Sequence, residues 1–345
     1  MIHSGKRLDY MDAVKGIGIL LVVMGHNLQG IPALTSWIYS FHMPLFFIVT
    51  GYLEAHRQAQ GAVHKPIGSY IRSKAASLLW PYMTFSIVNL VWLLLFRLVM
   101  GVQPENPFPV ILLKMLSTYG YRAMWFLPAM FFASVIHHSA GYKAPAATVF
   151  LAVLAGSTAS LVLERMDADL WMRYPIMYFG RIAIGVSFIC IGKKMYGILG
   201  HVRGAGIPVL TAACFAVTLL FPLIPNVNMS FARMQSIPLY YLLGCAGSAG
   251  ILLLARFCSP PADKNPLLYL GKNSLIIMAL HMDFPIEIAW MILGKAGIGA
   301  HLPLPAASGL AVMLEMAILA VAIAVINRCP WMLKYPINLK RRSLP

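Results

Sequence analysis

Residues 15–27 read KGIGILLVVMGHN, and the apolar run continues to Gly30. A helix turns about 100° per residue, so the eleven steps from Lys15 to His26 make about three turns and return both side chains to one face. At a rise of about 1.5 Å per residue they lie about 16 Å apart along the axis, which places Lys15 near one membrane surface and His26 toward the other. An ionisable group inside a spanning helix is costly unless it is paired or solvated, so both residues are functional candidates.

The composition is that of a membrane protein. Of the 345 residues, 59% are hydrophobic and 11% charged, and the mean hydropathy is +0.74. This proportion of apolar side chains exceeds what a soluble core holds. Apolar segments of about 20 residues predict membrane-spanning helices over residues 11–30, 34–54, 77–100, 122–139, 144–163, 174–193, 206–223, 236–257, 268–293 and 307–326. We therefore expect an all-α, polytopic transmembrane bundle of about ten helices that forms a single membrane-embedded domain over residues 1–345.

The basic residues set the expected orientation. With ten spans and both termini in the cytoplasm, eighteen lysines and arginines fall in cytoplasmic segments and six in the opposite loops. Positive residues collect on the cytoplasmic side, so this distribution predicts cytoplasmic termini. The net charge of +16 is then mostly the inside-positive bias, with anionic membrane lipids as partners and no nucleic acid. The five cysteines are scattered without paired spacing, which predicts neither disulfides nor a metal site.

Several polar residues within or beside the predicted spans are candidates for chemistry. Asp12 lies one helical turn before Lys15 and is placed to pair with it, although a snorkelling Lys15 in an interfacial ion pair is the simpler alternative. His42 stands beside Pro44, which we expect to kink its helix, so this histidine either serves chemistry or satisfies the kink. The predicted topology places Arg122 and Trp125 near the depth of His26, with further candidates at Arg181 and His281. Trp125 also has an alternative as a membrane-belt aromatic.

The sequence resembles the acyltransferase type 3 membrane proteins, which move acyl groups from acyl-CoA to cell-envelope glycans and other acceptors. The matching stretches are Arg7-Leu8-Asp9-Tyr10-Met11-Asp12-Ala13-Val14-Lys15-Gly16 with His26, Ser40-Phe41-His42-Met43-Pro44-Leu45-Phe46-Phe47, Thr50-Gly51-Tyr52-Leu53, Arg72 to Tyr82, Met124-Trp125-Phe126-Leu127-Pro128, and Tyr269-Leu270-Gly271-Lys272-Asn273-Ser274-Leu275 with His281. The family usually has Ser in place of Thr50. The stretches occur in the expected order over most of the chain.

The resemblance implies about ten helices in a bacterial inner membrane, an acyl-CoA donor that enters from the cytoplasm, and catalysis at the motif histidine. We expect His26 to act as general base, or to carry the acyl group as an acyl-histidine, while Asp12 holds Lys15. Oxyanion stabilisation is expected from His42, Arg181 or Trp125. The nucleotide phosphates of the donor are expected at Lys15, Arg72 and Lys74, which offer charge-assisted hydrogen bonds. The remaining substrate-contacting candidates are Arg122, Trp125, His281, Asn273 and Ser274.

The expected activity is O-acyl transfer, with acetyl-CoA as donor, no permanently bound cofactor, and a glycan or lipid-linked sugar as acceptor. A proton-coupled transporter of a sugar or organic acid is the alternative, with His26, His42, His281 and Arg181 as relay and substrate ligands. A third possibility is a structural subunit of an envelope-assembly complex, which would function without His26. The sequence does not distinguish acetyl from succinyl donors, nor does it identify the acceptor or the oligomeric state.

Overall fold

The computed structural model describes residues 10–28, 30–101, 106–167, 169–258 and 265–333. It is 82% helical, with no strand among these residues, so the predicted all-α fold is confirmed. The beginning of the first motif, residues 7–9, lies outside the described residues.

Length and hydropathy identify seven helical segments in the described ranges that can cross a membrane. They are Pro32–Ala59, Ile67–Val99, Pro145–Arg165, Trp171–Gly200, Gly206–Leu223, Ile237–Cys258 and Leu304–Ile326. An eighth candidate is a broken pair, Ser274–Leu280 and Phe284–Lys295, which bends by 63°. Two predicted spans are not among these candidates: the helix α1, Tyr10–Asn27, and the predicted span 122–139. The chain is therefore a multi-pass helical membrane protein.

The chain divides into two compact units, which we describe separately. The first comprises residues 1–25, 31–67 and 132–274. Its elements are α1 up to Gly25, α2 (Pro32–Tyr39), α3 (His42–Ala59), the π-helix η3 (His137–Gly141), α8 (Pro145–Arg165), α9 (Leu170–Gly200), α10 (Gly206–Thr218), the short 3₁₀ helices η4 (Phe221–Leu223) and η5 (Met229–Phe231), α11 (Ile237–Cys258) and α12 (Pro266–Lys272).

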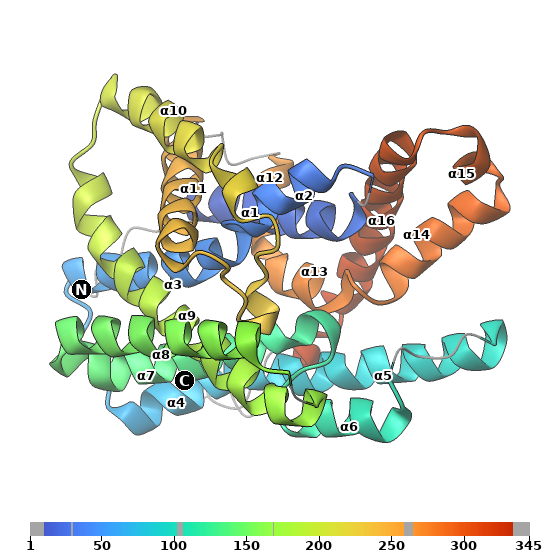
Figure 1. Cartoon of the computed structure of the whole chain (residues 1–345), viewed down its shortest axis with the longest axis horizontal. Coiled ribbons are helices and arrows are strands. Elements are labelled where there is room, and N and C mark those ends of the chain that lie inside the picture. Colours follow the sequence, from blue (N-terminus) through green and yellow to red (C-terminus); the bar gives the residue numbers. More distant parts are fainter. Residues whose placement is uncertain (1–9, 29, 102–105, 168, 259–264, 334–345) are drawn as a thin grey trace, which may run out of the picture. The chain divides into compact units, whose positions relative to one another are not determined.

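Helix α9 is central to the first unit because it packs against both α3 and α8 (Figure 1). Glycines bring α3 and α9 together: a Cβ on Gly51 would collide with the backbone of Ile189, and one on Gly192 would collide with the backbone of Ile48. Small residues permit this close approach of helix backbones in membranes. The same arrangement joins α1 to α12, where Gly16 lies against the Leu267 carbonyl. Gly16 therefore admits the backbone of α12.

The second unit comprises residues 26–30, 68–131 and 275–345, as far as these are described. Its elements are the last two residues of α1, α4 (Ile67–Lys74), the π-helix η1 (Ala75–Leu79), α5 (Trp80–Met100), α6 (Phe108–Leu116), the 3₁₀ helix η2 (Arg122–Trp125), the first half of α7 (Phe126–Ile136), α13 (Ser274–Leu280), α14 (Phe284–Lys295), α15 (Ile298–His301), α16 (Leu304–Ile326) and the 3₁₀ helix η6 (Pro330–Met332). Helices α14 and α16 pack side by side (Figure 1). Trp80 fastens α5 to η6 by donating its Nε1–H to the Trp331 carbonyl at 2.7 Å.

Three predicted segments differ from the observed helices. The predicted span 34–54 consists of α2 and α3, and Pro44 lies in the first turn of α3. Proline is tolerated there because a backbone N–H in the first turn has no carbonyl partner within the helix. The expected kink is thus a helix boundary at residues 40 and 41. The predicted loop 55–76 contains α4, which continues through η1 into α5. The predicted span 268–293 is divided into α12, α13 and α14.

Candidate functional site

A break in a membrane-type helix organises the candidate site in the second unit. Helix α13 ends at Leu280, α14 begins at Phe284, and the two are bent by 63°. A break frees backbone carbonyls, and an apolar environment supplies no water to satisfy them. Side chains supply the donors here: Asn89 of α5 donates its Nδ2–H to the Ala279 carbonyl at 2.9 Å, and His281 contacts the carbonyls of Ile277 and Met278 through Nδ1, both at 3.0 Å.

Arg122 is the cation of this site. Its Nη1 donates to the Met282 carbonyl within the break at 2.7 Å, to Glu287 Oε1 at 2.9 Å and to Asp283 Oδ1 at 3.4 Å. Its backbone has φ 48°, the left-handed region that non-glycine residues seldom adopt. Gly120, with φ 84°, folds so closely beneath η2 that a Cβ would collide with the Trp125 backbone. Such backbone strain persists where surrounding interactions determine the conformation, and it gathers at functional sites.

Two carboxylates share the Arg122 charge. Asp283 is buried at the start of α14 and Glu287 lies one turn later. Trp92 of α5 donates its Nε1–H to Glu287 Oε2 at 2.9 Å, so two helical elements hold the two oxygens of this carboxylate. Buried charges are stable when they are paired and hydrogen-bonded, and the Arg122 group meets that condition.

His26 contacts His281 at this break. Their ring centroids are 5.1 Å apart and the ring planes are inclined by 46°. Because carbonyl oxygens only accept hydrogen bonds, Nδ1 of His281 carries the hydrogen and Nε2 is the acceptor atom of the neutral ring. His281 is fixed by its own helix end and is buried, while His26 is partly exposed. The arrangement therefore holds one oriented, buried imidazole against a second imidazole that is only partly buried.

The residue after His26 is anchored to α16. The buried Asn27 donates its Nδ2–H to Glu315, a fully buried carboxyl in the middle of that helix. This hydrogen bond fastens the end of α1 and thereby limits the movement of the adjacent His26.

Other predicted site residues in the second unit are dispersed. Trp125 is buried in η2 with its ring edge-on to Phe126, which disfavours the membrane-belt alternative because belt aromatics face lipid. Arg72 is exposed on α4, and Lys74, at the end of the same helix, lies over the Tyr70 ring at 5.6 Å. Both cations are on the helix that leads into α5.

The first unit holds the remaining predicted residues. Lys15 Nζ and Asp12 Oδ1 form the expected ion pair at 2.7 Å. His42 donates from Nδ1 to the Ile38 carbonyl at 2.9 Å, which is the bond expected of a histidine that satisfies a helix boundary. Arg181 is fully buried in α9 and lies 5.3 Å from the Tyr178 ring centroid.

Asn273 and Ser274 mark a helix junction in that unit. Asn273 ends α12 and donates its Nδ2–H to the Tyr269 carbonyl at 2.9 Å, and Ser274 is the first residue of α13. These contacts are structural, and a substrate-contacting role for the two residues stays a prediction.

Sequence reasoning overlooked the acidic half of the site: Asp283, Glu287 and Glu315. A signal was present, because these are ionisable residues within predicted spans, and the rule that selected His26 applies equally to them. Glu315 is the only charged residue in α16. Trp92 and Asn89 carried no comparable signal, since single polar or aromatic residues are common in spanning helices.

A family model described as an acyltransferase domain matches residues 8–326, nearly the whole chain. No curated protein and no solved structure gave a match.

Proposed function

The chain belongs to this acyltransferase family, and from that premise we propose that it is a membrane O-acyltransferase that moves an acyl group from cytoplasmic acyl-CoA to a hydroxyl of a cell-envelope glycan or related acceptor. The observation that carries the proposal is the packing of His26 on His281 beside the Arg122, Asp283 and Glu287 group, all within one compact unit.

In the proposed reaction His26 is the general base. The neutral imidazole accepts the hydroxyl proton as the acceptor oxygen attacks the thioester carbonyl carbon. The carbon–oxygen bond forms, the carbon–sulfur bond breaks, and the departing thiolate takes the proton from the His26 imidazolium, which releases CoA. The partial exposure of His26 and the fixed orientation of His281 suit this role.

Arg122 is suited to stabilise the oxyanion of the tetrahedral intermediate. A guanidinium has five N–H donors, and every hydrogen bond that the described chain gives Arg122 goes through Nη1. Its Nε and Nη2 hydrogens remain available to a developing negative charge, which preorganised donors stabilise strongly. Trp125 is the second candidate donor in this unit, whereas the expected oxyanion roles of His42 and Arg181 stay predictions.

We further propose that the donor's phosphates bind cations at the cytoplasmic surface. Arg72 and Lys74 lie on the one short helix α4, and Lys15 stands eleven residues before His26 on α1. An extended pantetheine arm is about as long as the roughly 16 Å that separates those two positions along a helix. The orientation in a bacterial inner membrane, with cytoplasmic termini, belongs to the same proposal.

The test uses the full chain in nanodiscs with acetyl-CoA labelled in the acetyl group. The wild type is expected to release CoA and transfer label to an envelope extract, while His26→Ala does neither and His201→Ala, a change of an exposed histidine at the end of α9, behaves as wild type. Retained transfer by His26→Ala would contradict the base. Label that moves only across sealed vesicles, with no thioester consumed, would instead support the transporter alternative.

A further inference from the structure

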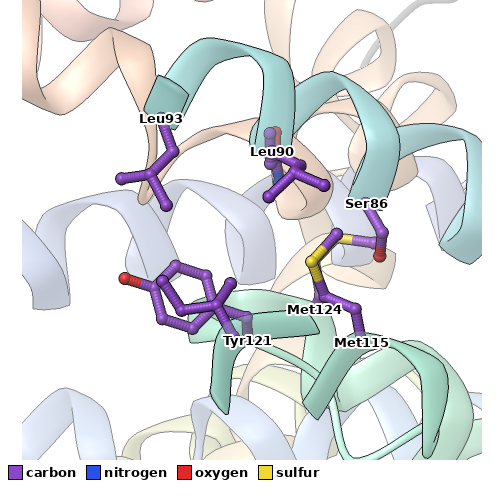
Figure 2. A pocket seen from close by; sticks show the side chains of 8 residues that line it. Ser86, Leu90, Leu93, Met115, Tyr121 and Met124 are labelled. Carbon is purple, nitrogen blue, oxygen red and sulfur yellow. The ribbon is translucent and has the colours of Figure 1, made fainter. Parts of the chain in front are cut away.

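A small cavity in the second unit is lined in part by Asn89 and Tyr121, which contact residues of the candidate site. It has a volume of about 10 Å³, room for about one water-sized group, and its wall includes Ser86, Asn89, Leu90 and Leu93 of α5, Met115 of α6 and Tyr121. Figure 2 shows Leu90 and Leu93 pointing from α5 toward the Tyr121 ring, with Met115 and Met124 beside it. None of the lining residues carries a charge.

Two residues of the cavity wall, Tyr121 and Asn89, connect it to the site. Tyr121 directly precedes Arg122, and its ring lies 5.6 Å from the Arg122 guanidinium carbon. Asn89 hydrogen-bonds the Ala279 carbonyl, two residues before His281. One turn further along α5, Trp92 holds Glu287. The residues that shape the cavity are therefore the neighbours of those that hold the Arg122 group and His281.

The lining chemistry selects the group that fits. Leucine and methionine side chains, with Ile111, make most of the wall apolar, which favours an alkyl group over a solvated one. The polar atoms Ser86 Oγ and Asn89 Oδ1 are buried and have no hydrogen-bond partner among the described residues. Asn89 Oδ1 is an acceptor and disfavours a carboxylate, and the wall offers no cation to neutralise one.

We propose that this cavity receives the alkyl end of the donor's acyl group and restricts the donor to acetyl. This proposal rests on the proposed function, for which it names the acyl class. A methyl group fills a water-sized space, whereas longer chains require more volume and a succinyl group would bring an unpaired carboxylate. One methylene in an apolar pocket changes specificity by about 10–200-fold.

The test is the chain-length profile of CoA release from acetyl-, propionyl-, butyryl- and succinyl-CoA, each measured as kcat/KM with the full chain in nanodiscs. Wild type is expected to favour acetyl-CoA over butyryl-CoA and succinyl-CoA. Leu90→Ala enlarges the cavity and should raise the butyryl-to-acetyl ratio by about tenfold or more. The matched control is Leu94→Ala, the same change one turn along α5 at an exposed position, which should leave the ratio unchanged.

If Leu90→Ala does not fold, Leu90→Val, which removes one carbon, should raise the propionyl-to-acetyl ratio. A ratio that stays equal to that of Leu94→Ala overturns the cavity assignment, as does a wild type that uses succinyl-CoA as well as acetyl-CoA. These outcomes leave the acyltransferase proposal intact, because CoA is still released. A wild type that releases CoA from no thioester overturns the proposed function itself, and the cavity assignment with it.

Discussion

Two pairs of histidine rings are in contact within the described part of the chain, one in each unit. In the first unit His64 and His138 are stacked face to face at 3.9 Å with 9° between their planes, and Tyr142 stacks on His64 at 3.9 Å. In the second unit His26 and His281 are 5.1 Å apart and tilted by 46°. The first pair joins a connection between helices to η3, since His138 Nε2 donates to the Lys65 carbonyl at 2.9 Å.

The difference lies in the surroundings of each pair. The His64 pair is a stack of rings that holds the connection between α3 and α4 against η3. The His26 pair stands at a helix break, beside an arginine with a strained backbone and two carboxylates. Contact between two histidine rings is therefore weak ground for a catalytic assignment, and the hydrogen-bonded Arg122 group at the helix break is what makes the His26 pair the candidate.

The largest expected effect separates the two pairs directly. His26→Ala should lower the rate of acyl transfer by about 10²–10⁴-fold, the usual contribution of a general base. His64→Ala should leave that rate within about twofold, because stacking at a connection contributes to local stability only. The measurement is kcat for CoA release, and equal losses in the two variants would remove the distinction.

The second effect concerns the charged group beside His281. Arg122→Gln leaves Asp283 and Glu287 without their cation, and breaking a buried pair from one side costs about 3 kcal/mol of stability. Thermal unfolding in detergent should show the loss, with Arg97→Gln, an exposed arginine on α5, as the control. Adding Asp283→Asn to Arg122→Gln should recover part of the stability. Additive losses in the double variant would contradict the coupling.

A smaller effect tests the charge of Lys15 near the beginning of α1. Lys15→Gln keeps a hydrogen-bond donor for Asp12 but removes the positive charge. Because one charge-assisted hydrogen bond to the donor's phosphates is lost, the KM for acetyl-CoA should rise by about tenfold with little change in kcat. Lys295→Gln, at the end of α14, is the control. A fall in kcat at constant KM would place Lys15 in the chemical step instead.

The smallest effect is the pH response of the stacked pair. Partial burial, with repulsion from His138, lowers the pKa of His64 below its ordinary value. The folded protein then binds fewer protons at His64 than the unfolded chain does. The contribution of the stack to stability is therefore full above about pH 6.5 and declines as the pH falls below that value. Protease cleavage between α3 and α4 should increase from pH 7.5 to pH 5.5 in wild type, and His64→Asn should reduce that dependence. A wild-type cleavage rate that does not change with pH would contradict this account.

Much of the fold followed from local sequence, and part of the site did as well. Where the structure describes them, the predicted spans are mostly helical, because long apolar runs have few other ways to satisfy their backbone in a membrane. The Asp12–Lys15 pair was predictable from spacing on one helix. The breaks at residues 40–41 and 281–283 were not, since side chains distant in sequence, such as Arg122 and Asn89, satisfy the freed carbonyls.

The sequence by itself determined that this is a multi-pass helical protein of the acyltransferase family, because hydropathy and motif spacing are properties of consecutive residues. The same properties indicated His26 as the candidate general base. Only the tertiary structure decided that His26 packs on His281, that Arg122 joins Asp283 and Glu287, and that a water-sized cavity is lined by their neighbours Tyr121 and Asn89. Those contacts join residues separated by up to 255 positions, and such pairings depend on how the helices pack. No local pattern specifies that packing.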